Sequence, residues 1–348
     1  MRIEDLTAQW LADALGTGVR GVHDLRYSPL GTGQVADTYR LSFGTGGTDR
    51  ASAVLKVTSA DPVSAATAVQ QRVYLREVRY YQALAPGLDI SVPRCLHAEI
   101  DTTSADFALL LEDLAPCRPG DQLVGCSVGE AELALRQAAE LHAPWWDKGE
   151  LGEFSWLPQP FLDLAPAVLD LLSDAFDDFG QRYAGALEPE VLDIGRQLFD
   201  RLPHYFALHT AAPPTVLHGD LRPDNLLFDA ADGTRPVVVV DWQTVQRGPG
   251  MLDVSYFLGG SLDPGTRRSA ERGLVALYHD QLRRLGVRDY SFEDCWRDYV
   301  RFSFQGYFTG VTSAMMVEQT ERGDRMFTHM VRRAARHISD LDAISQLY

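Results

Sequence analysis

The fold is decided by the stretch HGDLRPDNLLF, residues 218–228, which is followed by Asp241 at the end of the apolar run 237–240. A carboxylate such as Asp220 can orient a hydroxyl group and take its proton. Hard divalent cations bind the oxygen atoms of Asn and Asp side chains. The turn between residues 228 and 237 folds the chain back. We therefore expect Asp241 to lie beside Asn225 and to complete a metal site for nucleotide phosphates.

These motifs resemble those of the aminoglycoside phosphotransferase/choline kinase-like family, whose members are relatives of the protein kinases. The chain carries HGD and DWQ, residues 218–220 and 241–243, where protein kinases carry HRD and DFG, which favours a small-molecule kinase. The continuation over residues 248–258 looks most like the ecdysteroid-kinase-like branch. The resemblance implies that Asp220 is the catalytic base, that Asn225 and Asp241 are Mg²⁺ ligands, and that His218 is structural.

The resemblance covers residues from about 25 to about 337 and implies an α+β fold, the bilobal protein kinase-like fold. Residues 1–113 would form a small N-lobe with an N-terminal helix and an antiparallel sheet that binds nucleotide. Residues 114–348 would form a larger, mainly helical C-lobe. In that lobe, residues 218–258 would carry the catalytic and metal loops, and helices within about 125–212 would bind the acceptor.

Hydrophobic periodicity places the elements along the chain. Residues 4–15 have helical spacing, residues 38–43 and 53–57 alternate like two strands of a hairpin, and residues 64–84 read as one long helix. Two further strands are predicted at 92–93 and 107–111, and helical segments dominate after residue 130, apart from the hairpin at 225–240.

A glycine-rich segment, GTGQVA at residues 31–36, fits a dinucleotide-binding pattern. That pattern must open a helix, whereas here it precedes an alternating strand, so the dinucleotide fold is excluded. We expect Gly31 and Gly33 to let the backbone of a hairpin approach nucleotide phosphates closely, although ordinary turn chemistry also explains such glycines.

Lys56 lies in an apolar strand, AVLKV at residues 53–57, where an ammonium group needs a carboxylate or phosphate partner. The family carries a phosphate-binding lysine on the equivalent strand, paired with a glutamate that Glu77 matches. Glu77 as a helix-surface charge is the alternative. By the same resemblance, the backbone at Glu112 and Leu114 would bind the edge of the nucleotide base.

The composition limits the expected binding partners and the expected cellular location. The 348 residues contain 32 Lys+Arg, all Arg except Lys56 and Lys148, against 48 Asp+Glu, for a net charge of −16. This acidity argues against nucleic acid and anionic membranes as partners. The start has no apolar leader, no stretch is long enough to span a membrane, and the four cysteines lack metal-ligand spacing, so a soluble cytoplasmic protein is expected.

The sequence says least about which acceptor molecule the protein binds. Residues 163–193 hold eight acidic side chains that would suit a cationic amino sugar or simply form a solvated helix face; they are Asp163, Asp170, Asp174, Asp177, Asp178, Glu188, Glu190 and Asp193. The segment 142–146 places aromatic residues near the end of a helix, where they would stack on a ring acceptor or pack between helices. The sequence leaves the acceptor and the oligomeric state open.

The predicted function is transfer of the γ-phosphate of ATP or GTP to a hydroxyl group of a small acceptor, such as an amino sugar or another hydroxylated metabolite. Two alternatives remain. One is a nucleotide-binding pseudokinase without turnover, and the other is a metal-dependent hydrolase that uses His218, Asp220 and Asp241.

Overall fold

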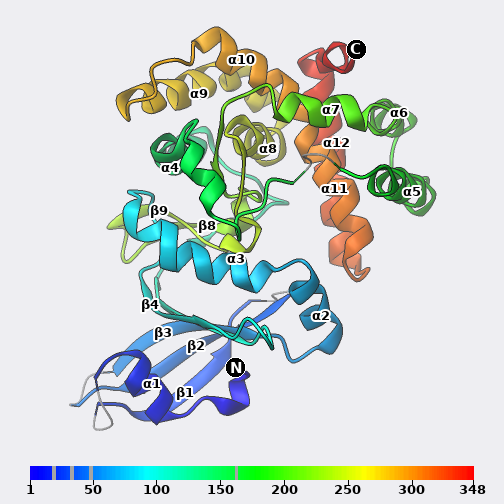
Figure 1. The fold of residues 1–348 in the computed structure, drawn as a ribbon. Helices are drawn as coiled ribbons and strands as arrows, with labels where there is room; N and C mark the ends of the chain where they lie inside the picture. Colours follow the sequence, from blue (N-terminus) through cyan, green and yellow to red (C-terminus); the bar gives the residue numbers. More distant parts are fainter. Residues whose placement is uncertain (18–20, 32–34, 47–49, 161–163) are drawn as a thin grey trace. The chain divides into compact units, whose positions relative to one another are not determined.

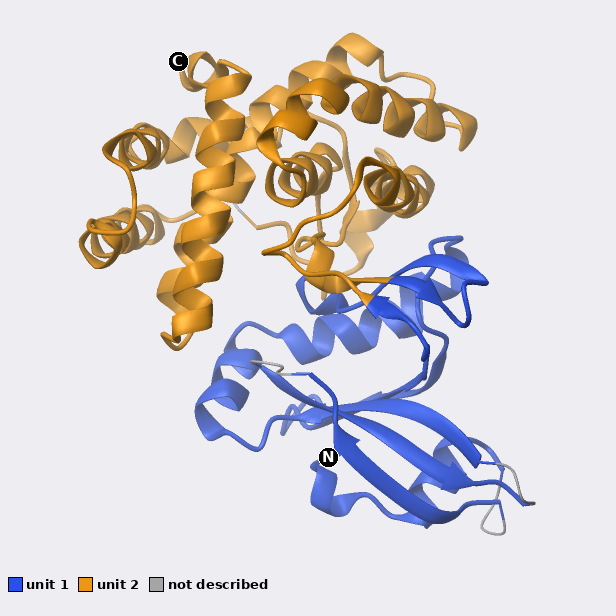
Figure 2. Ribbon diagram, turned by 180° about the vertical axis from the view of Figure 1, so that it is seen from behind, with its two compact units in different colours: residues 1–118, 228–244 blue, residues 119–227, 245–348 orange. Residues whose placement is uncertain are grey.

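The computed structural model describes the chain from residue 1 to residue 348 except for residues 18–20, 32–34, 47–49 and 161–163. It divides into two compact units (Figure 2). Unit 1 consists of residues 1–118 and 228–244, and unit 2 of residues 119–227 and 245–348. This division differs from the predicted one, which falls after residue 113, because residues 228–244 return to the first unit.

Unit 1 is built on a five-stranded antiparallel sheet in the order β1-β2-β3-β5-β4 (Figure 1). Its strands are β1 His23–Pro29, β2 Ala36–Gly44, β3 Arg50–Thr58, β4 Cys95–Ile100 and β5 Phe107–Glu112. Leu55 and Val57 of β3 are fully buried and pack, with Leu41, against Leu11 of helix α1, Ala8–Ala14. Because side chains alternate along a strand, Lys56 points to the opposite face of the sheet.

The predicted helix over residues 64–84 is broken, which corrects the sequence analysis. The chain forms α2, Pro62–Gln70, then α3, Val73–Arg79, and then a π-helical turn, Tyr80–Leu84. The break falls at Arg72, whose φ of 56° is left-handed. No glycine or proline marks it in the sequence, so periodicity carries through it. The break aligns α3 so that its buried face includes Glu77.

The predicted strand at residues 92–93 is also wrong, because β4 begins only at Cys95. Pro93 has no N–H to donate to a sheet ladder. The carbonyl groups of this stretch instead accept from the returning segment: Ser91 O accepts from Val239 N at 2.8 Å, and Val92 O accepts from Arg235 Nη2 at 2.6 Å.

The returning segment contains the predicted hairpin, β8 Leu226–Ala230 and β9 Arg235–Val239. It belongs to a small sheet of order β6-β8-β9, in which β6 is Arg118–Pro119, and the boundaries between the two units cut through β6 and β8. The Ala231 N–H donates to Leu114 O at 3.2 Å, and Arg235 forms an ion pair with Glu112. These contacts explain why residues 228–244 group with unit 1.

Unit 2 is mainly helical, as predicted. Its helices are α4 Val128–His142, α5 Pro166–Tyr183, α6 Pro189–Phe199, α7 Leu202–His209, α8 Met251–Ser261, α9 Pro264–Arg284, α10 Phe292–Arg301, α11 Gln305–Met316 and α12 Glu321–Asp340. Two short strands, β7 Pro214–Leu217 and β10 Gln246–Pro249, pair antiparallel.

Helix α8 forms the centre of unit 2. It is buried on all sides and packs against α4, α9, α10, α11 and α12. Its first turn follows β10 directly, so it is anchored close to the strand pair that leads into the 218–225 loop. Among the helices of the described chain, none is long and apolar enough to cross a membrane.

Candidate active site

The predicted site residues fall into two groups, one in each unit. Lys56, Glu77 and Asp241 come together in unit 1, and Asp220 and Asn225 come together in unit 2. The expected approach of Asp241 to Asn225 joins residues of different units and stays a prediction.

In unit 1, Lys56 lies between two carboxylates. Its Nζ is 2.7 Å from both carboxylate oxygens of Glu77 and 2.9 Å from Asp241 Oδ1. Lys56 reaches Glu77 from β3, Glu77 lies in the buried face of α3, and Asp241 follows β9. The ion pair that the sequence predicts between Lys56 and Glu77 is therefore present.

The charges in this cluster shift the pKa values of its members. Glu77 is 1% exposed, and one ammonium group faces two carboxylates. Burial opposes the charge of Lys56, but Asp241 and Glu77 outweigh it and raise the pKa of Lys56 above its ordinary value. Burial raises the pKa of Glu77, against the opposing effect of Lys56. The cluster thus holds Lys56 in its charged form.

The residues after Asp241 fix its orientation. Asp241 has a left-handed φ of 68°, and Gln243 Nε2 donates to its Oδ2 at 3.2 Å. The buried ring of Trp242 stacks on Tyr80, with 3.8 Å between ring centroids and 6° between planes, and the Trp242 N–H donates to Glu77 Oε1 at 3.3 Å. Gln243, to which the sequence gives no role, is thus a neighbour that holds the Asp241 carboxylate.

In unit 2, the loop that contains Asp220 is densely hydrogen bonded. Asp220 Oδ2 accepts from Arg222 Nε and from Asn225 Nδ2, both at 3.0 Å, and Oδ1 accepts from the hydroxyl of Tyr256 at 2.8 Å. Asn225 Nδ2 also donates to the Asp220 carbonyl oxygen at 2.8 Å. Both bonds use the amide nitrogen, so the contacts among the described residues leave the amide oxygen of Asn225 for a cation.

The backbone of the same loop is held by Asp253 of α8. Asp253 Oδ2 accepts from the His218 N–H at 2.7 Å, and its Oδ1 accepts from the Gly219 N–H at 2.9 Å. The buried ring of His218 accepts from the Asp220 N–H through Nδ1 at 3.2 Å. His218 and Asp253 therefore contact the backbone of the loop, as the structural role predicted for His218 requires.

The remaining residues predicted to contact the nucleotide, apart from Gly33, lie in unit 1. Gly31 has a left-handed φ of 77°, and a Cβ there would meet no atom within 4 Å, so only its backbone conformation favours glycine. Gly33 lies outside the described residues. The Glu112 N–H donates to Arg94 O at 3.0 Å, and Leu114 O accepts from the Ala231 N–H. The side chain of Asp113 binds the Ala115 N–H and forms an ion pair with Arg40.

Two segments were considered for the acceptor site. The structure favours a solvated helix face for residues 163–193 and packing between helices for residues 142–146. The described acidic residues of 163–193 are all exposed along α5, α6 and the connection between them; Asp163 lies outside the described residues. The His142 ring is buried and bonded to Tyr278 and Asp253, while Trp145 and Trp146 pack on Phe154 and Tyr290. The aromatic segment therefore packs inside unit 2.

An antiparallel sheet with a buried lysine–glutamate pair, and a helical unit with an aspartate and an asparagine five residues apart on one loop, define a kinase-like phosphotransferase. The chain belongs to the phosphotransferase enzyme family, whose model matches residues 26–293. Membership confirms the predicted phosphotransferase class. The finer assignment to the ecdysteroid-kinase-like branch stays a prediction.

Solved structures share the fold. A protein of Ralstonia eutropha JMP134 assigned as an aminoglycoside phosphotransferase has a TM-score of 0.57 at 17% identity, with 96% of each chain covered. The GDP complex of a variant of aminoglycoside 2'-phosphotransferase-IIIa has a TM-score of 0.54 at 16% identity, covering 99% of this chain and 93% of that chain. An ethanolamine kinase of Plasmodium vivax has a TM-score of 0.52 at 9% identity, covering 89% and 81%.

One curated relative is named as an oxidoreductase and not as a phosphotransferase. The chain is 23% identical over 313 residues to a Caenorhabditis elegans protein called uncharacterized oxidoreductase dhs-27. The match covers 81% of this chain but 38% of that protein, so the chain spans about two fifths of the length of that relative.

Proposed function

We propose that this phosphotransferase moves the γ-phosphoryl group of ATP or GTP to a hydroxyl group of a small acceptor, and that the two groups of residues above perform the reaction. The observation that carries the proposal is the Lys56 cluster, in which Nζ lies 2.7 Å from Glu77 and 2.9 Å from Asp241. Two carboxylates beside one ammonium group, with the Asp241 side chain 30% exposed, suit a divalent cation and the phosphates it carries.

The residues proposed to hold Mg²⁺ have suitable chemistry. Asn225 keeps its amide oxygen for a ligand, and Asp241 is a carboxylate held in place by Lys56 and Gln243. Of the residues that the structure describes, no three His, Cys, Asp or Glu side chains form a metal cluster. Mg²⁺ is commonly held by one or two carboxylates together with substrate phosphates, so Asn225, Asp241 and a nucleotide suffice. The ion would neutralise charge on the phosphates.

The chemical step assigns one task to each residue. The acceptor oxygen forms a bond to the γ-phosphorus while the bond from that phosphorus to the bridging oxygen breaks, and the nucleoside diphosphate leaves with that electron pair. The Asp220 carboxylate takes the proton of the acceptor hydroxyl. Lys56 stays protonated, as its raised pKa requires, and its ammonium group contacts a phosphate oxygen. Glu77 and Asp241 orient that ammonium group.

The base of the nucleotide would meet the segment that follows β5. The Glu112 N–H and the Leu114 carbonyl are already hydrogen bonded within unit 1. We therefore assign the contacts with the base to the Glu112 carbonyl and the Leu114 N–H. Both are backbone groups, so either ATP or GTP remains a donor to test. Gly31, with Gly33, would approach the phosphates.

The names of the similar proteins guide the choice of acceptors. They include an ethanolamine kinase and an aminoglycoside phosphotransferase solved with GDP and kanamycin. We propose the same broad class here, a small hydroxylated molecule, with amino sugars and amino alcohols as the first candidates. The exposed acidic residues of α5 and α6 do not narrow this class.

The test is a panel of acceptors assayed with Mg·ATP and Mg·GTP, with Asp220→Ala as the blank. The panel holds kanamycin, ethanolamine, neutral polyols and hydroxy acids. Asp220→Ala should lower transfer at least 10³-fold and leave nucleotide affinity within about threefold, because it removes the base and no proposed phosphate or metal contact. The control is Asp229→Ala, an exposed acid on the nearby hairpin, which should keep full activity.

Two outcomes would overturn the proposal. Full transfer by Asp220→Ala would show that another group takes the proton. A wild-type protein that binds Mg·nucleotide yet transfers phosphate to no acceptor, water included, would be a nucleotide-binding regulator instead.

A further inference from the structure

The two oxygens of the Asp220 carboxylate have different environments. Oδ2 accepts two hydrogen bonds from its own loop, from Arg222 Nε and Asn225 Nδ2 at 3.0 Å each. Oδ1 accepts one, from the hydroxyl of Tyr256 at 2.8 Å, and that hydroxyl comes from helix α8. A carboxylate oxygen offers two lone pairs, so the contacts among the described residues use both on Oδ2 and leave one on Oδ1.

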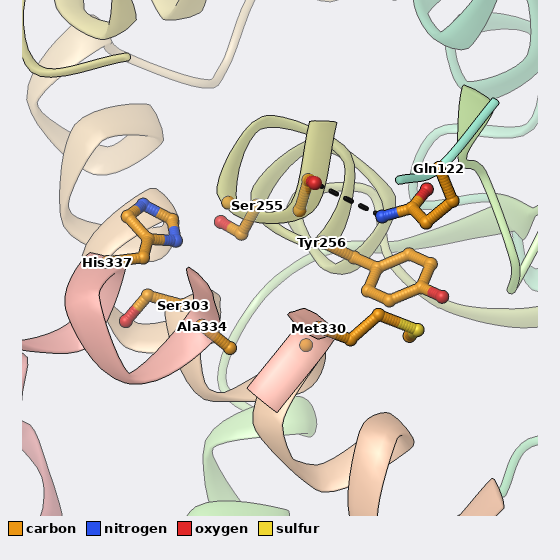
Figure 3. A pocket seen from close by; sticks show the side chains of 10 residues that line it. Gln122, Ser255, Tyr256, Ser303, Met330, Ala334 and His337 are labelled. Atoms are coloured by element: carbon orange, nitrogen blue, oxygen red, sulfur yellow. Dashed lines mark hydrogen bonds between the residues drawn. The ribbon is translucent and has the colours of Figure 1, made fainter. Parts of the chain in front are cut away.

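The environment of Tyr256 keeps its hydroxyl group protonated, so that it remains a hydrogen-bond donor. It is 5% exposed, and its ring lines a small pocket of unit 2 beside Gln122 and Met330 (Figure 3). Burial, and then the charge of Asp220, raise the pKa of Tyr256 well above its ordinary value, so the hydroxyl keeps its proton. The pocket walls also include Gly259, Gly260 and Gly306, which carry no side chain.

Helix α8 thus fixes the loop at two points. Asp253 binds the backbone at His218 and Gly219, and Tyr256 binds the carboxylate of Asp220. Asp253 and Tyr256 are three residues apart, so they share one face of the helix. Because α8 is the buried centre of unit 2, both contacts come from a rigid element.

We propose that Tyr256 is a positioning residue for the phosphoryl transfer, whose hydroxyl aims the remaining lone pair of Asp220 Oδ1 at the acceptor hydroxyl. This inference rests on the proposed function, in which Asp220 takes the proton. Arg222 and Asn225 both donate to Oδ2, which alone would leave the carboxylate group free to rotate. The hydrogen bond from Tyr256 to Oδ1 prevents that rotation. Tyr256 acts through Asp220 and does not itself touch the acceptor.

The experiment compares Tyr256→Phe with a matched control. The control is Tyr205→Phe, because Tyr205 is also fully buried in unit 2 and its hydroxyl donates to Gln305 Oε1 at 3.1 Å. Each variant removes one buried hydroxyl and keeps the ring, so both should lose a similar, small amount of stability. Only Tyr256→Phe should affect the reaction.

We expect Tyr256→Phe to lower kcat about 10- to 100-fold, with KM for acceptor and nucleotide within about threefold, since misplacement of a reacting group by about 1 Å costs up to 100-fold. Tyr205→Phe should keep kcat within twofold. The rate is measured with the acceptor that the panel identifies, and also with water, and is expressed per site that binds Mg·nucleotide, so that unfolded protein does not enter it.

The outcomes separate this inference from the proposed function. If Asp220→Ala is inactive and Tyr256→Phe has the wild-type kcat, the positioning role is wrong while the proposed function stands. If Asp220→Ala is active, the proposed function fails first. If Tyr256→Phe changes KM with no change in kcat, the hydroxyl serves binding, which also overturns the inference. In the Asp220→Ala background, Tyr256→Phe should cause no further loss.

Discussion

Replacement of Lys56 by methionine tests the charge cluster of unit 1. Methionine keeps most of the apolar length of the side chain and removes the ammonium group, which leaves Glu77 and Asp241 facing each other. Glu77 is 1% exposed, whereas the Asp241 side chain is 30% exposed and can turn to solvent. The cost therefore falls on Glu77. Lys148→Met is the control, because Lys148 is the other lysine of the chain and is exposed.

The structure limits the size of the effect. Leaving a buried carboxylate charged after removal of its partner costs about 3–5 kcal/mol. Glu77 can instead take up a proton, and that costs about 1.4 kcal/mol for each pH unit above an unfolded pKa of about 4.3. The cheaper route sets the penalty, which is then about 1.6 kcal/mol at pH 5.5 and about 3–5 kcal/mol at pH 8. Lys148→Met should change stability by less than about 0.5 kcal/mol at either pH.

The sign follows from proton linkage. In the variant the folded-state pKa of Glu77 lies above its unfolded value, so the folded state binds more protons and stability falls as the pH rises above about 4.3. In the wild type the pKa of Lys56 is raised, so the lysine stays charged and its contribution is constant between pH 5.5 and 8. The pKa of Glu77 is raised in the wild type too, but there Lys56 opposes the rise, so stability should fall more steeply with pH in the variant.

Urea unfolding at pH 5.5 and pH 8 measures the effect. Lys56→Met should unfold at lower urea than the wild type at both values, with the larger difference at pH 8. In Lys56→Met/Glu77→Gln, neither charge is left alone, so most of the lost stability at pH 8 should return. If Lys56→Met matches the wild-type midpoint at pH 8, or loses more at pH 5.5 than at pH 8, then Lys56 does not neutralise a buried charge and the reasoning fails.

Two other substitutions test one hydrogen bond and one buried histidine. Gln243→Leu removes the donor at 3.2 Å from Asp241 Oδ2 and should raise the Mg²⁺ concentration needed for nucleotide-induced thermal stabilisation about three- to tenfold, the worth of one hydrogen bond; an unchanged requirement would show that Gln243 does not orient the carboxylate. Burial lowers the pKa of His209 to about 3, below the unfolded value of about 6.5, so the unfolded state binds its proton first and stability falls as the pH drops below 6.5. His209→Leu should reduce the loss of melting temperature between pH 7 and pH 5, whereas His204→Leu, at an exposed histidine, should not; equal losses in both variants would contradict the assignment.

Local sequence predicts an element correctly where a residue with a chemical role lies within a clear hydrophobic pattern. The strand that carries Lys56 was predictable because apolar residues flank a single cation, and Glu77 followed from the implied pairing. The hairpin after Asn225 was predictable from its two apolar runs. The break at Arg72 was not, because the chain there contains no glycine or proline, and tertiary packing of α3 overrides the helical pattern that continues through it.

The contacts that orient the functional groups were harder to find from sequence. Gln243 is two residues from Asp241, yet nothing in the pattern shows that its amide turns back to that carboxylate. Tyr256 is 36 residues from Asp220, and only the packing of α8 brings its hydroxyl to the loop. The one available signal is its spacing of three from Asp253. That spacing is informative only once Asp253 is known to hold the loop backbone.

The division into two units also separates two requirements of the proposed reaction. Lys56, Glu77 and Asp241 are fixed to one another by the sheet and α3, whereas Asp220, Asn225 and Tyr256 are fixed to one another by α8. The chain leaves unit 2 directly after the 218–225 loop and returns to it only after the Asp241 turn. The proposed contact of Lys56 with phosphate and the proposed placement of the Asp220 carboxylate therefore depend on separately packed cores. A substitution in one core can then impair one requirement while the internal geometry of the other group is preserved.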